Sequence, residues 1–126
     1  MTKRKLRAGV VGFGHLGYHH ARIYNELEDV DLVGIVDISE ERRKKAESEF
    51  NIPAFKDVSD LIDSGIEIAS VATPTVTHSE VSIPLLDAGV HLLVEKPIAD
   101  TIPNAQMIIE KAKERKCLLQ VGHIER

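Results

Sequence analysis

The sequence predicts a single α/β domain, residues 1–126, built on a doubly wound parallel sheet. Apolar runs typical of buried strands alternate with helical patterns along the chain, which is the pattern of successive β–α–β units. A glycine-rich turn, Gly12–Gly17, joins the first apolar run to the first helical run, and the second apolar run ends in Asp37. At 126 residues the chain has the length of one domain with its own core.

Six strands and five helices are expected in order. The apolar runs predict strands at residues 6–11, 31–36, 54–55, 66–72, 91–94 and 117–121. Three helices are predicted at residues 15–27, 40–50 (with Ser39 as N-cap) and 59–63. A fourth begins at a capping box of Thr77 and Glu80 and ends at Gly89. The fifth has Pro103 in its first turn and an apolar face of Ala105, Ile108, Ile109 and Ala112.

Composition and charge exclude several classes of protein. The net charge is −4, with 43% hydrophobic and 29% charged residues, and no basic stripe or basic amphipathic segment occurs. We therefore expect neither a nucleic acid nor a membrane surface as partner. No apolar run approaches the ~18–20 residues that a membrane span needs. Cys117 is the only cysteine and cannot form an internal disulfide, which suits a reducing cytoplasm, the location we expect.

The spacing of Gly12, Gly14 and Gly17 is typical of a dinucleotide site of the Rossmann type. Gly12 allows a tight turn, Gly14 lets the backbone approach a pyrophosphate, and Gly17 lets the helix pack close to the strand. The helix N-terminus offers free N–H groups and a positive dipole end to the phosphates. Asp37 can accept hydrogen bonds from the ribose hydroxyls and would repel a 2′-phosphate, so NAD is expected rather than NADP. The alternative is an ordinary glycine turn with an incidental acid.

The remaining candidate residues follow other strands. In open α/β sheets ligands bind beyond the carboxyl ends of the strands, so these positions should share one edge. The candidate cofactor-binding residues at that edge are Gly12, Phe13, Gly14, His15, Leu16, Gly17, Asp37, Ile38, Ala72, Thr73, Pro74, Glu95, Lys96 and Gly122.

Taken together, these motifs resemble the N-terminal domain of the Gfo/Idh/MocA family, the glucose–fructose oxidoreductase and inositol dehydrogenase family. The resemblance covers essentially the whole chain. It implies the NAD-binding domain of an oxidoreductase that transfers hydride between nicotinamide and a hydroxyl-bearing carbon of a sugar, sugar nucleotide or polyol. It also implies a second domain that binds substrate, without which this chain is expected to be inactive, and a possible homo-oligomer. The residues that carry it are the glycine turn with His20 and Ala21, Asp37, Ala72-Thr73-Pro74, His78, Glu80, Gly89, His91, Glu95-Lys96-Pro97 and Val121-Gly122.

The same resemblance assigns roles to single residues. It places Lys96 beside nicotinamide and substrate as the catalytic residue, next to a proline bond that is often cis, and it brings His78 towards the cofactor. Many members carry Asn where this chain has Thr75 and Ile124. The ending at residues 123–126 is similar to members that act on nucleotide-linked sugars.

Several other interpretations remain open. His15, His19 and His20 have a spacing compatible with metal binding, but no carboxylate or cysteine accompanies them, and no metal site is expected. The basic run 42–45 could bind a 2′-phosphate, although interleaved glutamates favour a solvated helix face. Two rival functions are a non-enzymatic dinucleotide sensor, like a repressor of the same family, and a stand-alone nucleotide or CoA-binding module.

Overall fold

The computed structural model describes residues 4–122, and in that range six parallel strands form one sheet in the order β3-β2-β1-β4-β5-β6. This order confirms the predicted doubly wound parallel sheet, with two β–α–β halves that diverge from a central pair of strands. The strands are β1 (Leu6–Val11), β2 (Val30–Val36), β3 (Ala54–Phe55), β4 (Ile68–Val71), β5 (His91–Glu95) and β6 (Leu119–Gly122).

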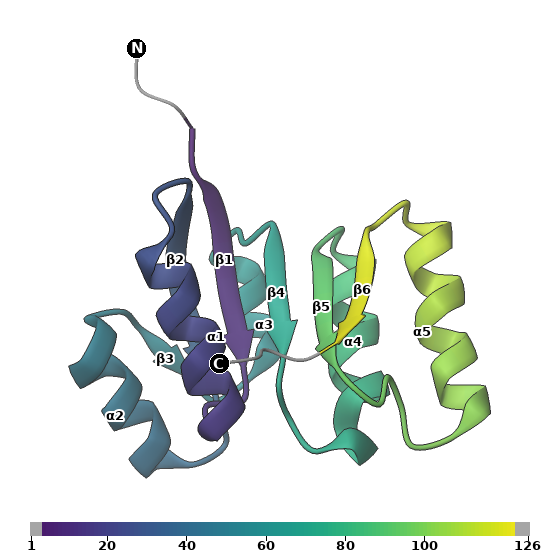
Figure 1. Ribbon diagram of the computed structural model, residues 1–126, viewed down its shortest axis with the longest axis horizontal. Coiled ribbons are helices and arrows are strands. Elements are labelled where there is room, and N and C mark those ends of the chain that lie inside the picture. The colour runs from purple at the N-terminus through teal and green to yellow at the C-terminus, as the bar shows by residue number, and fades with distance from the viewer. Residues whose placement is uncertain (1–3, 123–126) are drawn as a thin grey trace.

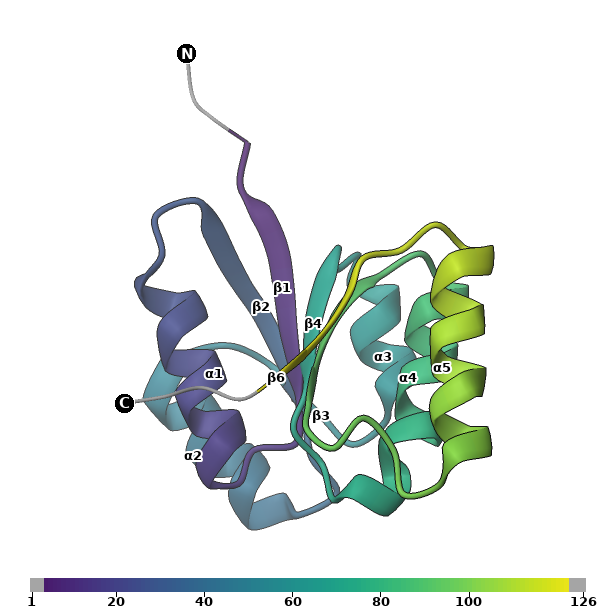
Figure 2. The ribbon, with the colours of Figure 1, turned by 45° about the vertical axis from the view of Figure 1, so that its right-hand side comes forward.

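Helices cover the two faces of the sheet unequally. Figure 2 shows α1 (His15–Glu26) and α2 (Glu40–Phe50) on one side of the sheet. On the other side lie α3 (Val58–Asp63), α4 (His78–Asp87) and α5 (Ile102–Glu114). The helices α1 and α2 therefore cover one face of the half that contains β1, β2 and β3. The helices α4 and α5 cover the opposite face of the half that contains β4, β5 and β6. Within the described residues no helix has the length and apolar character that a bilayer crossing requires.

The register aligns the carboxyl ends of five strands in one row. Val11 of β1 pairs with Val36 of β2 and with Val71 of β4, and the row continues through Val94 of β5 to Val121 of β6. These ends lie together along the lower edge of the sheet in Figure 1. Whatever residue follows each valine is therefore placed at the same edge.

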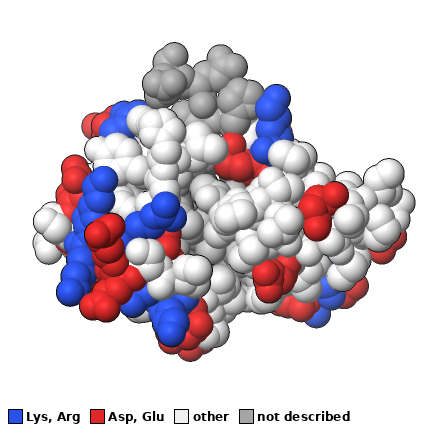
Figure 3. Space-filling view, turned by 90° about the horizontal axis from the view of Figure 1, so that it is seen from below, with Lys and Arg blue, Asp and Glu red and all other residues white. Residues whose placement is uncertain are grey.

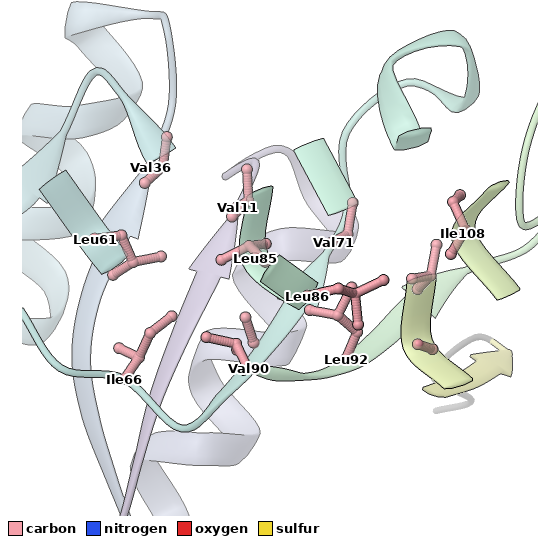
Figure 4. Close-up of a cluster of buried hydrophobic side chains, with 13 residues drawn as sticks. Val11, Val36, Leu61, Ile66, Val71, Leu85, Leu86, Val90, Leu92 and Ile108 are labelled. Carbon is pink, nitrogen blue, oxygen red and sulfur yellow. The ribbon is translucent and has the colours of Figure 1, made fainter. Parts of the chain in front are cut away.

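Two clusters of buried side chains hold the layers together. The larger joins the sheet to α3, α4 and α5 through residues such as Leu61, Leu85 and Ile108 (Figure 4). The smaller lies under α1 and α2 and includes Ile35 and Ala46. Each fully buried leucine or isoleucine contributes about 1.5–3 kcal/mol, so these clusters fix the sheet that positions the strand ends.

The predicted capping box at the start of α4 is wrong. A 3-10 turn, Thr75–Thr77, precedes the helix, and Thr77 makes no side-chain cap hydrogen bond. Its hydroxyl instead lies 2.7 Å from the Pro74 carbonyl oxygen and 2.8 Å from the Thr73 hydroxyl. The tight turn points this hydroxyl backwards, away from the first free N–H groups of α4.

The other helix signals are largely confirmed. Ser39 caps α2 by accepting a hydrogen bond from the Arg42 N–H, and Gly89 follows α4 with a φ of +82°. The predicted apolar face of α5 needs one correction. Ile108 and Ala112 are buried, but Ile109 is 39% exposed because it lies a quarter-turn away from them around the helix.

Candidate functional site

The turns that leave the carboxyl edge of the sheet are held side by side by backbone hydrogen bonds. The Gly12 N–H donates to the Val36 carbonyl at 2.7 Å, and the Ala72 N–H donates to the Val11 carbonyl at 2.8 Å. In the same way the Lys96 N–H donates to the Gly122 carbonyl at 3.1 Å. The structure therefore brings the predicted positions of five strands to one edge.

The glycine turn has the geometry that its spacing predicted. Gly12 has a φ of +95°, which favours glycine, and a Cβ on Gly17 would lie 1.7 Å from the Gly12 carbonyl oxygen. A Cβ on Gly14 would meet no atom closer than the Arg42 guanidinium at 3.7 Å. The first two glycines therefore differ in role: Gly12 shapes the turn, and Gly14 leaves open space at the N-terminus of α1, where a phosphate can approach the backbone.

Asp37 is fixed in position beside this turn. Its side chain is buried, one carboxylate oxygen accepts a hydrogen bond from the Phe13 N–H at 2.7 Å, and the other accepts one from the Ser39 N–H at 2.8 Å. Each oxygen retains a second lone pair that can accept a ligand hydroxyl. The arrangement suits a vicinal diol presented from the solvent side. Its neighbour Ile38 is 83% exposed and forms part of the same rim.

Two arginines of α2 reach Asp37, which the sequence analysis did not anticipate. Arg42 places a guanidinium nitrogen 3.8 Å from the Asp37 carboxylate, and Arg43 donates a 2.9 Å hydrogen bond to the Asp37 carbonyl oxygen. Arg42, Lys44 and Lys45 are exposed, as a solvated helix face requires, while Arg43 is half-buried against the Asp37 carbonyl. The Ser39 cap was the available signal, because it places the residues of the first turn next to the end of β2.

A cavity of about 500 Å³ opens between the start of α1 and α2. Among the predicted residues, Phe13, Gly14 and His15 line it, and the buried Phe13 ring also packs edge-on against Tyr18 and Phe50. In the view onto the carboxyl edge (Figure 3), charged side chains gather over α2 and the centre of the face is mostly uncharged. The cavity is lined by Phe13, Gly14, His15, Tyr18, Glu41, Arg42, Lys45 and Glu49.

His78 lies behind the edge, between the loops that follow β4 and β5. It is 1% exposed, with Nε2 2.9 Å from the Thr73 carbonyl oxygen and Nδ1 3.2 Å from the Ile98 carbonyl oxygen. Each ring nitrogen thus faces a backbone carbonyl oxygen, and a nitrogen that carries a proton donates to its partner. Direct contact between His78 and a cofactor remains a prediction that the structure does not test.

Glu95 and Lys96 point to different environments. The Glu95 carboxylate is buried and lies 2.5 Å from Nε2 of His20 on α1, a contact that no local pattern in the sequence indicated. Lys96 is exposed, and its bond to Pro97 is cis, as the resemblance implied. The ammonium group is thus available at the edge, while its neighbour is held inside.

No group of three or more potential metal-ligating side chains occurs within residues 4–122. His15 and His19 lie ring to ring, with centroids 4.7 Å apart.

The remaining predicted residues lie at the same edge. Leu16 is exposed on the first turn of α1, and Ala72 and Gly122 directly follow Val71 and Val121. The expectations for His123 and Ile124 lie outside the described residues.

Comparisons with known proteins agree with this geometry. A family model described as "Oxidoreductase family, NAD-binding Rossmann fold" matches residues 6–123. The chain is 38% identical over 121 residues to UDP-N-acetylglucosamine 3-dehydrogenase of Acidithiobacillus ferrooxidans, covering 96% of this chain and 38% of that protein. It is 32% identical to inositol 2-dehydrogenase of Salmonella typhimurium, again covering 96% and 38%.

Solved structures give the same result. The crystal structure of GenD2 from gentamicin A biosynthesis, in complex with NAD, superposes with a TM-score of 0.90 at 28% identity. That match covers 95% of this chain and 35% of GenD2. The chain therefore spans less than two-fifths of the length of these relatives.

Proposed function

The chain belongs to the Gfo/Idh/MocA oxidoreductase family as its NAD-binding Rossmann domain, and from this we propose that it works within a longer dehydrogenase. The proposed reaction is hydride transfer between nicotinamide and a hydroxyl-bearing carbon of a sugar, sugar nucleotide or polyol. The observation that carries the proposal is the preset Asp37 carboxylate, bonded to the Phe13 N–H of the glycine turn.

The first half of the sheet fits the adenosine side of a dinucleotide. Asp37 offers acceptors for a ribose diol, and Gly14 leaves space for a pyrophosphate at the N-terminus of α1. A dinucleotide that lies along the carboxyl edge of the sheet would then extend its nicotinamide half over the ends of β4, β5 and β6. Thr73, Pro74 and Lys96 are the residues available there.

Lys96 is the proposed catalytic residue. Bound nicotinamide supplies the hydride chemistry, and the protein must orient the partners and handle the hydroxyl proton. An exposed ammonium group at the end of β5 can stabilise a developing alkoxide or relay its proton. The position of Lys96 at the edge, with Glu95 held inside by His20, supports this role.

The remaining assignments are proposals of the same kind. Residues 1–126 would form one dinucleotide-binding domain of a cytoplasmic protein. The full-length protein would assemble as a homo-oligomer. Sugar or sugar-nucleotide contacts would come from the part of the relatives that this chain does not match.

The 126-residue chain should bind NAD yet show negligible dehydrogenase turnover. The residues proposed to bind the cofactor all lie within it, whereas the substrate-positioning groups that supply much of an enzyme's rate are expected elsewhere. Calorimetric titration with NAD and a spectrophotometric assay with sugars and polyols test both parts. Steady turnover at about 1–10³ per second would contradict the proposed dependence on further chain. Failure to bind NAD alongside tight binding of CoA would replace the proposal with a CoA-binding module.

Asp37 should give a preference for NAD over NADP of more than about tenfold, because its buried charge repels a 2′-phosphate. Asp37→Ser should bring the ratio of the NADP and NAD dissociation constants closer to one. Adding Ile38→Arg should bring it closer still. Titrating both cofactors into each variant measures the ratio. Lys44→Ala is the matched control, because Lys44 is exposed and pairs with Glu40 on α2. An unchanged ratio in Asp37→Ser would remove this carboxylate from the cofactor site.

A further inference from the structure

We propose that His78 is a positioning residue that connects the two loops on which the second half of the dinucleotide would rest. One ring nitrogen meets the carbonyl oxygen of Thr73, in the loop after β4, and the other meets that of Ile98, in the loop after β5. Ile98 lies two residues beyond Lys96. The histidine therefore couples the position of the proposed catalytic lysine to that of Thr73 and Pro74. This inference rests on the proposed function.

The loops need such a connection because the sheet ends before them. The last paired positions of β4 and β5 are Val71 and Val94, so Thr73 and Ile98 lie beyond their shared ladder. On its other side, the β5 loop is attached to β6 by the Lys96 N–H, which donates to the Gly122 carbonyl. His78, at the first position of α4 and packed into the core, reaches both loops from behind.

A second buried histidine holds the preceding end of the same segment. His20 of α1 contacts the Glu95 carboxylate, so the residues at positions 95 and 98 are both anchored from the interior. Lys96 and Pro97 between them are exposed. An exposed segment fixed at both ends can present its lysine in a constant direction without burying the charge.

The two contacts of His78 can be separated experimentally. A neutral imidazole carries one N–H and donates to one carbonyl, whereas the protonated ring donates to both. The amide nitrogen of asparagine approximates Nδ1, and that of glutamine approximates Nε2. His78→Asn therefore keeps a donor towards Ile98, and His78→Gln keeps one towards Thr73. Ser82→Ala is the matched control, since Ser82 is fully buried one turn further along α4.

The first measurement is amide hydrogen exchange in the free chain, which needs no cofactor. We expect faster exchange at the amides of residues 96 and 98–100 in His78→Gln and of residues 72, 73, 75 and 76 in His78→Asn, with neither change in Ser82→Ala. The second is calorimetric titration with NAD and with ADP, which contains only the adenosine half and the pyrophosphate. Each His78 variant should weaken NAD binding by about fivefold or more, the equivalent of one lost hydrogen bond, and leave ADP within about twofold.

The outcomes separate this proposal from the function on which it rests. Normal NAD affinity in both His78 variants overturns the positioning role and leaves the proposed function intact. Equal weakening of NAD and ADP also overturns it, because that result indicates a general loss of folded structure. If the unmodified chain binds ADP but not NAD, the proposed function fails and the positioning role fails with it. Faster exchange in one loop for each His78 variant supports the connection through both carbonyls, whereas a change in only one variant shows that the ring bonds a single loop and overturns the connection.

Discussion

Replacing Lys96 by alanine in a full-length protein that carries this domain should lower kcat by about 100-fold or more, while NAD affinity changes by less than about threefold. Lys96 is exposed at the end of β5, so its side chain contributes little to the core. An ammonium group that acts on the hydroxyl of the substrate is needed mainly in the transition state. Its loss should therefore reduce kcat rather than ground-state binding of the cofactor.

Steady-state kinetics and calorimetry on the same preparation check this prediction. Lys44→Ala is a suitable control, because Lys44 is an exposed lysine on α2 that pairs with Glu40. Its kcat should remain close to that of the unmodified protein. A Lys96→Ala variant with near-normal kcat would show that the catalytic assignment is wrong, whereas a parallel loss of NAD binding would make Lys96 a cofactor ligand.

Gly17→Ala should lower the free energy of unfolding of the chain by at least about 2 kcal/mol. The added Cβ would lie 1.7 Å from the Gly12 carbonyl oxygen, a contact between two backbone segments that no side-chain rotation can relieve. Either α1 must move away from β1 or the turn must change its shape. Urea unfolding followed by circular dichroism measures the loss.

Gly14→Ala is the matched control for that substitution. A Cβ at Gly14 meets only the end of a flexible arginine at 3.7 Å, and its φ of −83° is open to any residue. We expect little change in stability but weaker NAD binding, because the methyl group would occupy the space left for the pyrophosphate. Equal stability of the two variants would contradict the packing role of Gly17.

The sequence was sufficient to predict the features that depend on local patterns. The alternation of apolar runs and helices indicated the parallel sheet, and the glycine spacing indicated a turn at the end of β1, where the Phe13 N–H bonds to Asp37 at the end of β2. Because strand ends in a parallel sheet share an edge, motifs far apart in the chain could be assigned to one site from residue order alone. Errors at this level concern single turns, such as the 3-10 turn that displaces the Thr77 cap.

The contacts that the sequence could not predict join segments far apart in the chain. Nothing local indicates that His20 meets Glu95, or that His78 meets the carbonyl of Ile98. The packing of α1 and α4 against the sheet determines which groups these histidines contact. A backbone carbonyl is present in every residue, so the sequence does not show which one accepts a hydrogen bond. Arg42 is an intermediate case, because the Ser39 cap places it near Asp37, but its side chain is 56% exposed and its contact with the carboxylate could not be predicted from the cap alone.

The central position of β1 has a consequence for how the chain emerges during synthesis. β1 is the first strand to be made, yet its pairing with β4 requires residues Ile68–Val71, which follow only after half of the chain. At about 5–20 residues per second, one side of the strand stays without its partner for several seconds. The hydrogen bond from the Ala72 N–H to the Val11 carbonyl, directly before the glycine turn, also forms only then. A nascent chain stalled before β4 should therefore be unable to retain a nucleotide, so nucleotide capture would report that β1 has gained both of its neighbours in the sheet.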